Sequence, residues 1–359
     1  MNRKIRVLMC GSDINAFKGG MVTVIRNYLE CGEFHQSRLI FVKTHTDGSK
    51  ARRIVCYAKA YIMVIALLIG RRIDIAHLHM AERGSFYRKA WLMKLLHIFR
   101  VPVILHHHGA EFEDFYQKLS GRRKRYVRKV LESAECNLVL SELLRRKILK
   151  KAPKAAVSVL PNAVEVPGER RYQPAPAKII MLGRQGKRKG SYDLLKALAA
   201  VRNQLPEQTE VWMCGDGEVE SVKEKARELG VERQVICTGW ISGKEKGACL
   251  KDATIHVLPS YREALPMSIL ETMSLGIPNI STRVASIPEV IEEGENGFLI
   301  QPGDIEALGN RMLRLLEDGE LREKMSINSY RKMQDDFSLQ ACVRRLEEIY
   351  ADCLQRSGG

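Results

Sequence analysis

The sequence predicts a two-domain α/β protein, and three observations support this class. The order strand, glycine-containing turn, helix repeats through both halves of the chain. A length of 359 residues is long for one domain and sufficient for two, and a hydrophobic content of 45% supports full-sized cores. A charged stretch with three prolines separates the halves. The expected parts are a first domain at 1–166, a linker at 167–177, a second domain at 178–336, and a terminal helix and tail at 337–359.

Short apolar runs mark the strands of the first half. They lie at 5–10, 39–42, 74–79, 101–108, 137–141 and 157–161. After the first strand, Gly19 and Gly20 open a helix, and backbone at such a pair can approach a phosphate closely. A plain turn between strand and helix explains the same two glycines, so the residues alone leave both interpretations open.

Two further segments of the first half bear on membranes. The apolar part of residues 51–70 is shorter than 18 residues and is interrupted by Lys59, which predicts a buried helix rather than a membrane span. Residues 122–131 combine basic side chains with Tyr126, Val127, Val130 and Leu131. This pattern predicts a basic amphipathic helix that either faces solvent or docks on anionic lipid.

Histidines gather at the ends of two predicted strands. His77 and His79 alternate with apolar residues and are expected to share one face. The consecutive residues 106–108 are all histidine, but neighbouring strand residues point to opposite faces, so these three cannot converge on one metal ion.

In the second half, the strands are expected at 178–183, 210–214, 234–238 and 254–258. Helices are expected from Pro266 to Gly276 and at 305–316, 320–332 and 339–354. The repeated order of strand, turn and helix indicates that both domains are Rossmann-like.

Two carboxylates frame the helix that begins near Pro266. Glu263 precedes it and Glu271 follows eight residues later, inside it. A helix start offers unpaired N–H groups to an anion, and carboxylates accept hydrogen bonds from vicinal hydroxyls. A nucleotide sugar carries both groups. Two glutamates at this spacing also occur as solvated charges on ordinary helices.

The stretch 258–276 resembles the E-x7-E signature of the retaining glycosyltransferases of family 4, which have the GT-B fold. Residues 288–304 resemble the segment that follows this signature, and 183–190 resembles the family's G-R-x4-K-G loop. The run 161–165 resembles P-N-G-V-D, with alanine and glutamate at its third and fifth positions. Many members carry Gly-Gly where Ala285 and Ser286 stand, which leaves the shape of that loop open.

The resemblance implies two Rossmann-like domains facing across a cleft, with the last helix crossing back to the first domain. It implies catalytic roles for Glu263 and for His108, which contacts the donor sugar. It implies donor binding by Gly19, Gly20, Arg184, Lys189, Gly190, Ile241, Leu265, Met267, Ser268 and Glu271. Arg184 and Lys189 would grip the diphosphate, and cations at that place can neutralise the leaving group.

Charge and cysteine content restrict the partners and the compartment. Residues 1–165 carry 31 Lys and Arg against 13 Asp and Glu, so all of the net charge of +16 lies in this half. Such asymmetry points to an anionic partner. Nine scattered cysteines without a C-x-x-C pair predict a reducing compartment, with neither disulfides nor a zinc site. The start of the chain leads us to expect no signal peptide.

The expected function is transfer of a hexose or N-acetylhexosamine, with retention, from a nucleoside diphosphate sugar to a lipid-linked saccharide in surface polysaccharide synthesis. We expect no metal or other cofactor, no nucleic-acid partner, and a cytoplasmic location, peripheral on an anionic membrane. Two alternatives are a nucleotide-sugar epimerase of the same fold and a non-catalytic basic protein that binds membranes or nucleic acid. Only 6% of residues are aromatic and no nucleic-acid motif is present, which argues against nucleic acid.

Overall fold

A computed structural model describes residues 3–175 and 177–358; residues 1, 2 and 359, and residue 176 of the expected linker, lie outside the described residues. The chain forms two compact units. Unit 1 comprises Met1–Ala163 and Leu339–Gly359, and unit 2 comprises Val164–Ser338. The expected linker is therefore part of unit 2, where Arg170 pairs with Glu323 and the Tyr172 hydroxyl donates to the carbonyl of Thr254 at 2.8 Å.

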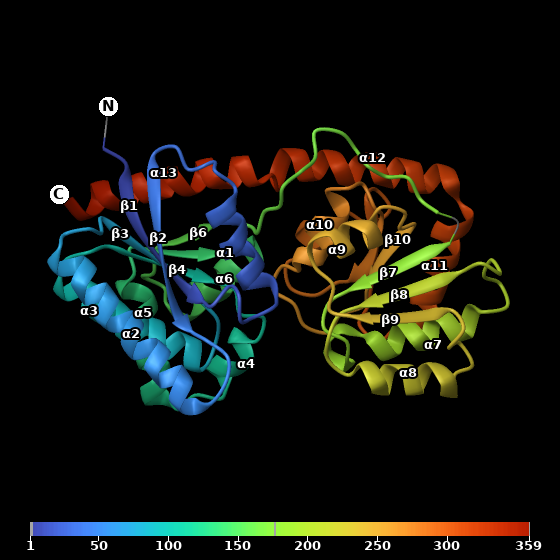
Figure 1. The fold of residues 1–359 in the computed structure, drawn as a ribbon, viewed down its shortest axis with the longest axis horizontal. Helices are drawn as coiled ribbons and strands as arrows, with labels where there is room; N and C mark the ends of the chain where they lie inside the picture. Colours follow the sequence, from blue (N-terminus) through green and yellow to red (C-terminus); the bar gives the residue numbers. More distant parts are fainter. Residues whose placement is uncertain (1–2, 176, 359) are drawn as a thin grey trace. The chain divides into compact units, whose positions relative to one another are not determined.

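Unit 1 is a parallel six-stranded sheet with helices on both faces, in the strand order β2-β1-β3-β4-β5-β6 (Figure 1). Parallel neighbours require helical crossovers, which is why helices and strands alternate along the chain. Its elements are β1 (Ile5–Ser12), α1 (Gly20–Glu30), β2 (Ser37–His45), α2 (Lys50–Ile69), β3 (Ile75–Met80), α3 (Gly84–Ile98), β4 (Val103–His107), α4 (Phe112–Gln117), α5 (Gly121–Ser133), β5 (Cys136–Val139), α6 (Glu142–Lys151), β6 (Val157–Val159) and α13 (Leu339–Gly358).

The last helix, α13, packs in unit 1 although unit 2 precedes it in the chain (Figure 1). The Tyr350 hydroxyl hydrogen-bonds His77 Nδ1 on β3 at 2.7 Å, and the Gln36 amide donates to Glu347 Oε1 at 2.8 Å. Tyr350 is fully buried. The prediction that the terminal helix returns to the first domain is confirmed.

Helix α2 differs from the prediction of a buried helix. Its residues Ala60, Val64 and Leu68 are buried, but Ile54, Ile62 and Ile69 are 69%, 67% and 71% exposed. The helix is thus apolar around most of its circumference, and periodicity alone cannot show which side is covered. No helix within the described ranges is long and apolar enough to cross a membrane, as predicted for this segment.

Helix α5 forms where the basic amphipathic pattern predicts it, but its apolar residues are not available to lipid. Val127, Val130 and Leu131 are buried in the core of unit 1, and Tyr126 is half-buried. Only the basic side of this helix faces solvent. The most exposed large apolar side chains described in unit 1 lie on α2 and α3, where Trp91 is 61% and Ile98 76% exposed.

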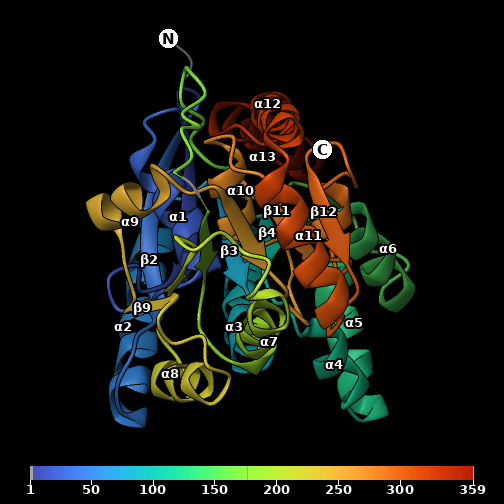
Figure 2. The same ribbon diagram turned by 90° about the vertical axis from the view of Figure 1, so that its right-hand side faces the viewer.

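Unit 2 is a second parallel six-stranded sheet, in the order β12-β11-β10-β7-β8-β9. This order reverses between β10 and β7, as in a Rossmann sheet. Helix α11 packs beside α7 on one face of this sheet (Figure 2). The elements are β7 (Lys178–Leu182), η1 (Lys187–Lys189), α7 (Ser191–Val201), β8 (Glu210–Cys214), α8 (Val219–Glu228), β9 (Val235–Gly239), α9 (Gly243–Leu250), β10 (Ile255–Leu258), α10 (Met267–Met273), β11 (Asn279–Thr282), η2 (Ile287–Glu289), β12 (Gly297–Ile300), α11 (Ile305–Glu317) and α12 (Gly319–Asp336).

Candidate active site at the strand-order reversal of unit 2

The candidate site lies at the carboxyl ends of β7 and β10. These strands pair in parallel at the point where the strand order of the sheet reverses. In open α/β sheets, the crevice beyond such a reversal is where ligands bind. The loop after β7 contains the G-R-x4-K-G pattern, and the loop after β10 contains Glu263. The sheet topology thus brings together two motifs that are far apart in the sequence.

Lys189 and Glu263 form a buried ion pair between these loops. Lys189 Nζ lies 2.5 Å from Glu263 Oε1, and the two side chains are 13% and 7% exposed. The hydroxyl of Ser260 donates to the same carboxylate oxygen at 2.8 Å. Removing two charges from water is costly unless they are paired and hydrogen-bonded, as they are here. Removal of either partner would therefore leave a buried, unpaired charge, which destabilises the site.

Gly190 explains how the two loops come so close. Its φ of +75° lies in the left-handed region, and a Cβ there would meet the carbonyl oxygen of Pro259 at 2.1 Å. Backbone bonds then join the loops, since the Tyr261 amide donates to the Arg188 carbonyl at 2.9 Å. Only glycine satisfies both the conformation and the contact. The glycine of the loop motif thus has a structural role next to any role in donor binding.

The loop after β8 closes the other side of the site. The Gln185 amide donates to the Asp216 carbonyl at 2.6 Å, and a Cβ on Gly215 would meet the Gly183 carbonyl oxygen at 1.9 Å. Arg184, in the loop after β7, has an exposed side chain without a hydrogen-bond or ion-pair partner among the described residues. It is therefore available to an anionic ligand.

Glu271 lies in α10 and has its own cation. Its Oε1 is 2.7 Å from Lys246 Nζ of α9. Pro266 precedes the helix as its cap and not as its first helical residue, and no side chain caps the first turn. The two carboxylates of the signature are thus held by different lysines, Glu263 deeply and Glu271 near the surface.

The other donor residues predicted in unit 2 are mostly covered. Leu265 and Met267 are 5% and 6% exposed, Ser268 is half-buried, and Ile241 packs on a small apolar cluster. Contacts from Leu265 and Met267 to a donor would therefore come from their backbone. Ala285, in the loop whose shape the sequence left open, has a φ of +48°, so this alanine adopts a backbone conformation that glycine favours.

Three predicted site residues lie in unit 1. Gly19 has a φ of +130° and precedes α1, and Gly20 is its first residue. His108 Nε2 lies 2.9 Å from His79 Nδ1, and burial lowers the pKa of His108 to about 3, so its imidazole is neutral. A neutral imidazole offers one donor and one acceptor to a ligand.

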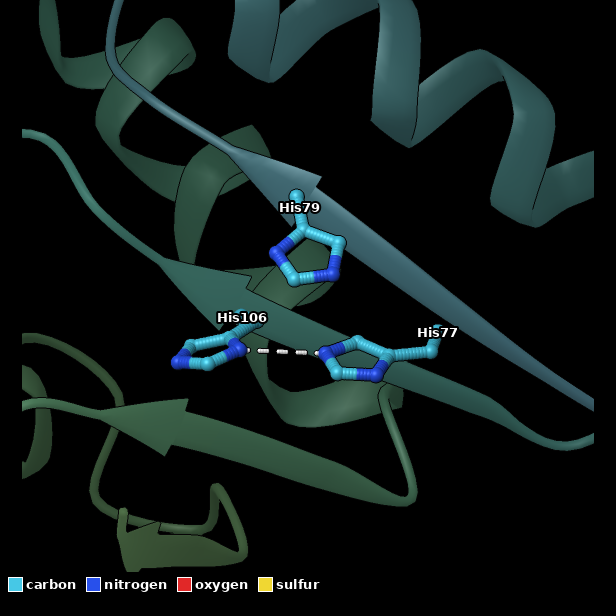
Figure 3. Close-up of side chains that lie close together, drawn as sticks. All are labelled: His77, His79 and His106. Carbon is cyan, nitrogen blue, oxygen red and sulfur yellow. Dashed lines mark hydrogen bonds between the residues drawn. The ribbon is translucent and has the colours of Figure 1, made fainter. Parts of the chain in front are cut away.

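His108 belongs to a stack of histidines on one face of the unit 1 sheet, as the strand alternation predicts. His106 and His108 lie 4.2 Å apart between ring centroids, and His77 Nε2 hydrogen-bonds His106 Nδ1 at 3.1 Å (Figure 3). His107 points to the opposite face and bonds Asn137 at 3.1 Å. The alternation of side chains along the strand thus separates His107 from His106 and His108, as predicted.

Ring nitrogens of His77, His79 and His106 lie within 4.8 Å of one another, which raises the question of a metal site. The rings of His77 and His79 are stacked with 4.3 Å between centroids and 21° between planes. A metal lies about 2.0 Å from each ligand nitrogen and in the plane of its ring. Two stacked rings cannot both satisfy this for one ion, so the arrangement suits a buried network of neutral imidazoles better than a metal centre.

These buried histidines predict a stability that falls in mild acid. Burial lowers the pKa of His77 to about 3 and that of His107 to about 4, against about 6.5 in an unfolded chain. As pH falls, these histidines are therefore protonated in the unfolded chain before they are protonated in the folded protein. The part of the free energy of unfolding that they contribute above pH 6.5 is lost as a result. At pH 5.5 each of these two residues lowers the stability by about 1 kcal/mol. Native-state hydrogen exchange of β3 and β4 amides at pH 7.5 and 5.5 would measure this loss.

His107→Gln is expected to reduce this loss of stability by about 1 kcal/mol. His35→Gln is the control, because that side chain is 79% exposed and should leave the loss unchanged. Equal losses in the wild type and in His107→Gln would contradict the assignment of a neutral, buried His107.

Several residues of the site were not predicted from the sequence. Ser260 stands three positions before Glu263, and this local spacing could have indicated its hydrogen bond. Lys246 carries no motif, and its contact with Glu271 depends on how α9 packs. His256 of β10 is fully buried, and its pKa is lowered to about 4 by burial, an effect that the charge of Lys189 reinforces. It is thus a neutral imidazole near the ion pair.

Both halves of the chain match glycosyltransferase family models. Residues 169–332 match the family described as glycosyl transferases group 1, and residues 19–166 match glycosyltransferase family 4. Together the matches cover most of the chain. The protein therefore belongs to this glycosyltransferase family, as the E-x7-E unit and the G-R-x4-K-G loop predict.

Individual relatives agree with this membership. An Escherichia coli UDP-Gal:α-D-GlcNAc-diphosphoundecaprenol α-1,3-galactosyltransferase is 26% identical over 324 residues, covering 82% of this chain and 79% of that protein. Sucrose-phosphate synthase from Thermosynechococcus elongatus matches 98% of this chain and 100% of its own with a TM-score of 0.82 at 17% identity. Anabaena HepE in complex with UDP-glucose matches 97% of this chain and 100% of its own, with a TM-score of 0.76 at 17% identity. These structures share the fold, and the predicted GT-B class is confirmed.

Proposed function

We propose that this glycosyltransferase moves a hexose or N-acetylhexosamine from a nucleoside diphosphate sugar, with retention, to a lipid-linked saccharide in surface polysaccharide synthesis. The observation that carries the proposal is the meeting of Lys189 and Glu263 at the strand-order reversal of unit 2. A cation for the diphosphate and a carboxylate for sugar hydroxyls then stand side by side. HepE has been crystallised with UDP-glucose, which supports a donor of this class.

In this mechanism the donor exchanges the partners of the two ion pairs. Lys189 turns from Glu263 to the diphosphate, where Arg184 and the amides of Met267 and Ser268 also donate. The freed Glu263 accepts hydrogen bonds from the sugar, and Glu271 accepts them from the ribose. Cations fixed at the departing diphosphate stabilise the charge that develops as the glycosidic bond breaks. For Gly19, Gly20 and His108 of unit 1, a role in donor binding rests on the family resemblance alone. We expect no metal requirement.

Release of nucleoside diphosphate from a panel of UDP- and GDP-sugars tests the proposal. The reaction is run in EDTA, with and without a lipid-diphosphate saccharide acceptor, and the anomeric configuration of the product is read by NMR. Acceptor-stimulated release from one donor, with an unchanged anomeric configuration, is expected. Inversion would overturn the retaining mechanism, and rescue of an EDTA-silent enzyme by a divalent ion would overturn metal independence. Absence of donor binding across the panel would overturn the function.

An acceptor carried by lipid implies work at a membrane, which we place at the cytoplasmic face. Two features of unit 1 support contact with anionic lipid. Its sequence holds the entire positive excess of the chain, and α2 presents Ile54, Ile62 and Ile69 to solvent. Apolar side chains bordered by basic residues such as Arg71 suit an anionic bilayer surface.

Ile62→Glu is expected to weaken binding to phosphatidylglycerol vesicles by at least about tenfold. The substitution removes apolar area that would be buried in the bilayer, and the new carboxylate is repelled by the anionic lipid. Vesicle flotation measures this partition. Leu143→Glu, on exposed α6 of the same unit, adds the same charge at a residue 38% exposed and should change binding little. Equal partition of both variants would show that α2 does not touch the bilayer.

A further inference from the structure

Unit 1 contains a cavity of about 840 Å³ at the carboxyl ends of its central strands. Ser12 is the last residue of β1 and Ala81 is the first residue after β3, and both line the cavity. The strand order β2-β1-β3 reverses here, just as the order of unit 2 reverses at β7 and β10. By the same topological rule, this is where the first sheet is built to receive a ligand.

The lining is strongly basic. Arg53, Arg83 and Arg88 border the cavity, against the single carboxylate of Glu82. Glu111 engages Arg83 at 2.7 Å, and Asp47 lies 3.6 Å from Arg53. Arg88 is half-buried, yet its guanidinium has no hydrogen-bond or ion-pair partner among the residues that the structure describes. A guanidinium withdrawn from water without an anion is costly, so this group is prepared for one.

Two pKa shifts agree with uncompensated positive charge at this place. Burial and the neighbouring Arg53 lower the pKa of Arg88. Burial, together with Arg88, Arg53 and Lys89, lowers the pKa of His45 to about 4. An anion with several oxygens would relieve this repulsion, because two guanidinium forks can each take a pair of phosphate oxygens.

The rest of the lining is suited to an apolar chain. Met21, Ile54 and Tyr57 contribute apolar surface, and Ile54 begins the exposed face of α2 that continues through Ile62 to Ile69. That face extends over about 22 Å of helix. Glu82 Oε2 is buried against Gly109 without a hydrogen-bond partner, so it adds an unpaired carboxylate oxygen to this edge of the lining.

We propose that this cavity binds the diphosphate of an amphiphile, a diphosphate ester of a long apolar chain, with Arg53 and Arg88 on the phosphates and the chain leaving along α2. The inference rests on the proposed function, since it identifies the acceptor of that reaction as a lipid diphosphate and gives its site in unit 1.

Calorimetric titration of the full chain with soluble probes tests the site. Farnesyl diphosphate is expected to bind more tightly than inorganic pyrophosphate, and farnesol more weakly than either. Arg88→Gln and Arg53→Gln are each expected to weaken farnesyl diphosphate binding at least about tenfold, as loss of a charge-assisted pair predicts. Arg53 is 46% exposed, so its replacement does not threaten the fold. Arg123→Gln, on the exposed basic side of α5, is the control and should bind as the wild type does.

The outcomes separate this inference from the proposed function. UDP is titrated in parallel and should bind all variants equally. The cavity assignment is overturned, while the donor function stands, if UDP binds but farnesyl diphosphate does not. It is also overturned if Arg123→Gln weakens the binding of farnesyl diphosphate as much as Arg88→Gln does. If a soluble short-chain phosphatidylglycerol below its micelle concentration binds as tightly as farnesyl diphosphate, a lipid headgroup and not a diphosphate is the ligand, which also overturns it. Loss of UDP binding alone would instead count against the proposed function.

Discussion

Replacement of Glu263 by glutamine is expected to lower the rate of sugar transfer by about 10²–10³-fold, because a preorganised charge at the reacting sugar is lost. The side chain is nearly isosteric and can still accept a hydrogen bond from Ser260, which now bonds the carboxylate at 2.8 Å. The substitution should therefore lower kcat measured with the preferred donor. Steady-state kinetics with saturating acceptor measure it. Glu295→Gln is the control, since that carboxylate pairs with Lys324 on the surface and should retain full activity.

The ion pair allows catalytic and structural roles to be separated. Lys189→Met leaves Glu263 buried without its cation and is expected to destabilise unit 2 by about 3–5 kcal/mol. The double variant Lys189→Met with Glu263→Gln removes both charges and should recover most of that stability. Activity should not return. A double variant that is stable and active would show that the pair serves the fold alone.

Gly190→Ala is expected to destabilise unit 2 by about 3 kcal/mol, from left-handed strain and from overlap with the backbone of Pro259. The Cβ would stand 2.1 Å from that carbonyl oxygen, and backbone cannot rotate away as a side chain can. Donor binding should weaken as well, because the loops of Lys189 and Glu263 would separate. Thermal unfolding and UDP titration measure the two effects.

Gly239→Ala provides the matched comparison. Its φ is +70°, close to that of Gly190, but nothing lies within 4 Å of a Cβ added there. It should therefore cost only the conformational strain, about 1 kcal/mol. If both substitutions cost the same, the close approach of the two loops is not what makes Gly190 necessary.

Much of the fold was predictable because the strands of parallel sheets are short apolar runs with glycine turns behind them. The run before Pro259 became β10, and the run before Gly183 became β7. The terminal helix was expected to return to the first domain only through the family resemblance. Its buried Tyr350, bonded to His77, gives the physical reason for that return.

The helices on the surface of unit 1 were less predictable. Residues 51–70 were expected to be buried because they are apolar, yet Ile62 and Ile69 face solvent. Residues 122–131 were considered for lipid contact, yet Val127 and Leu131 fill the core. Both differences have one cause, since a sequence pattern shows that a helix has an apolar side but not what covers that side.

The sequence by itself determined the class of this protein and the residue types of its candidate site. The local motifs around Glu263 and Lys189 contain the charges, the glycine and the helix start, and these depend only on neighbours in the chain. The tertiary structure alone decided that these two residues meet across 74 positions of sequence, at 2.5 Å. The physical reason is the strand order, which places β7 beside β10 and so joins the loops that follow them. The same rule brings Arg53 and Arg88 to the cavity of unit 1, where no motif marks them.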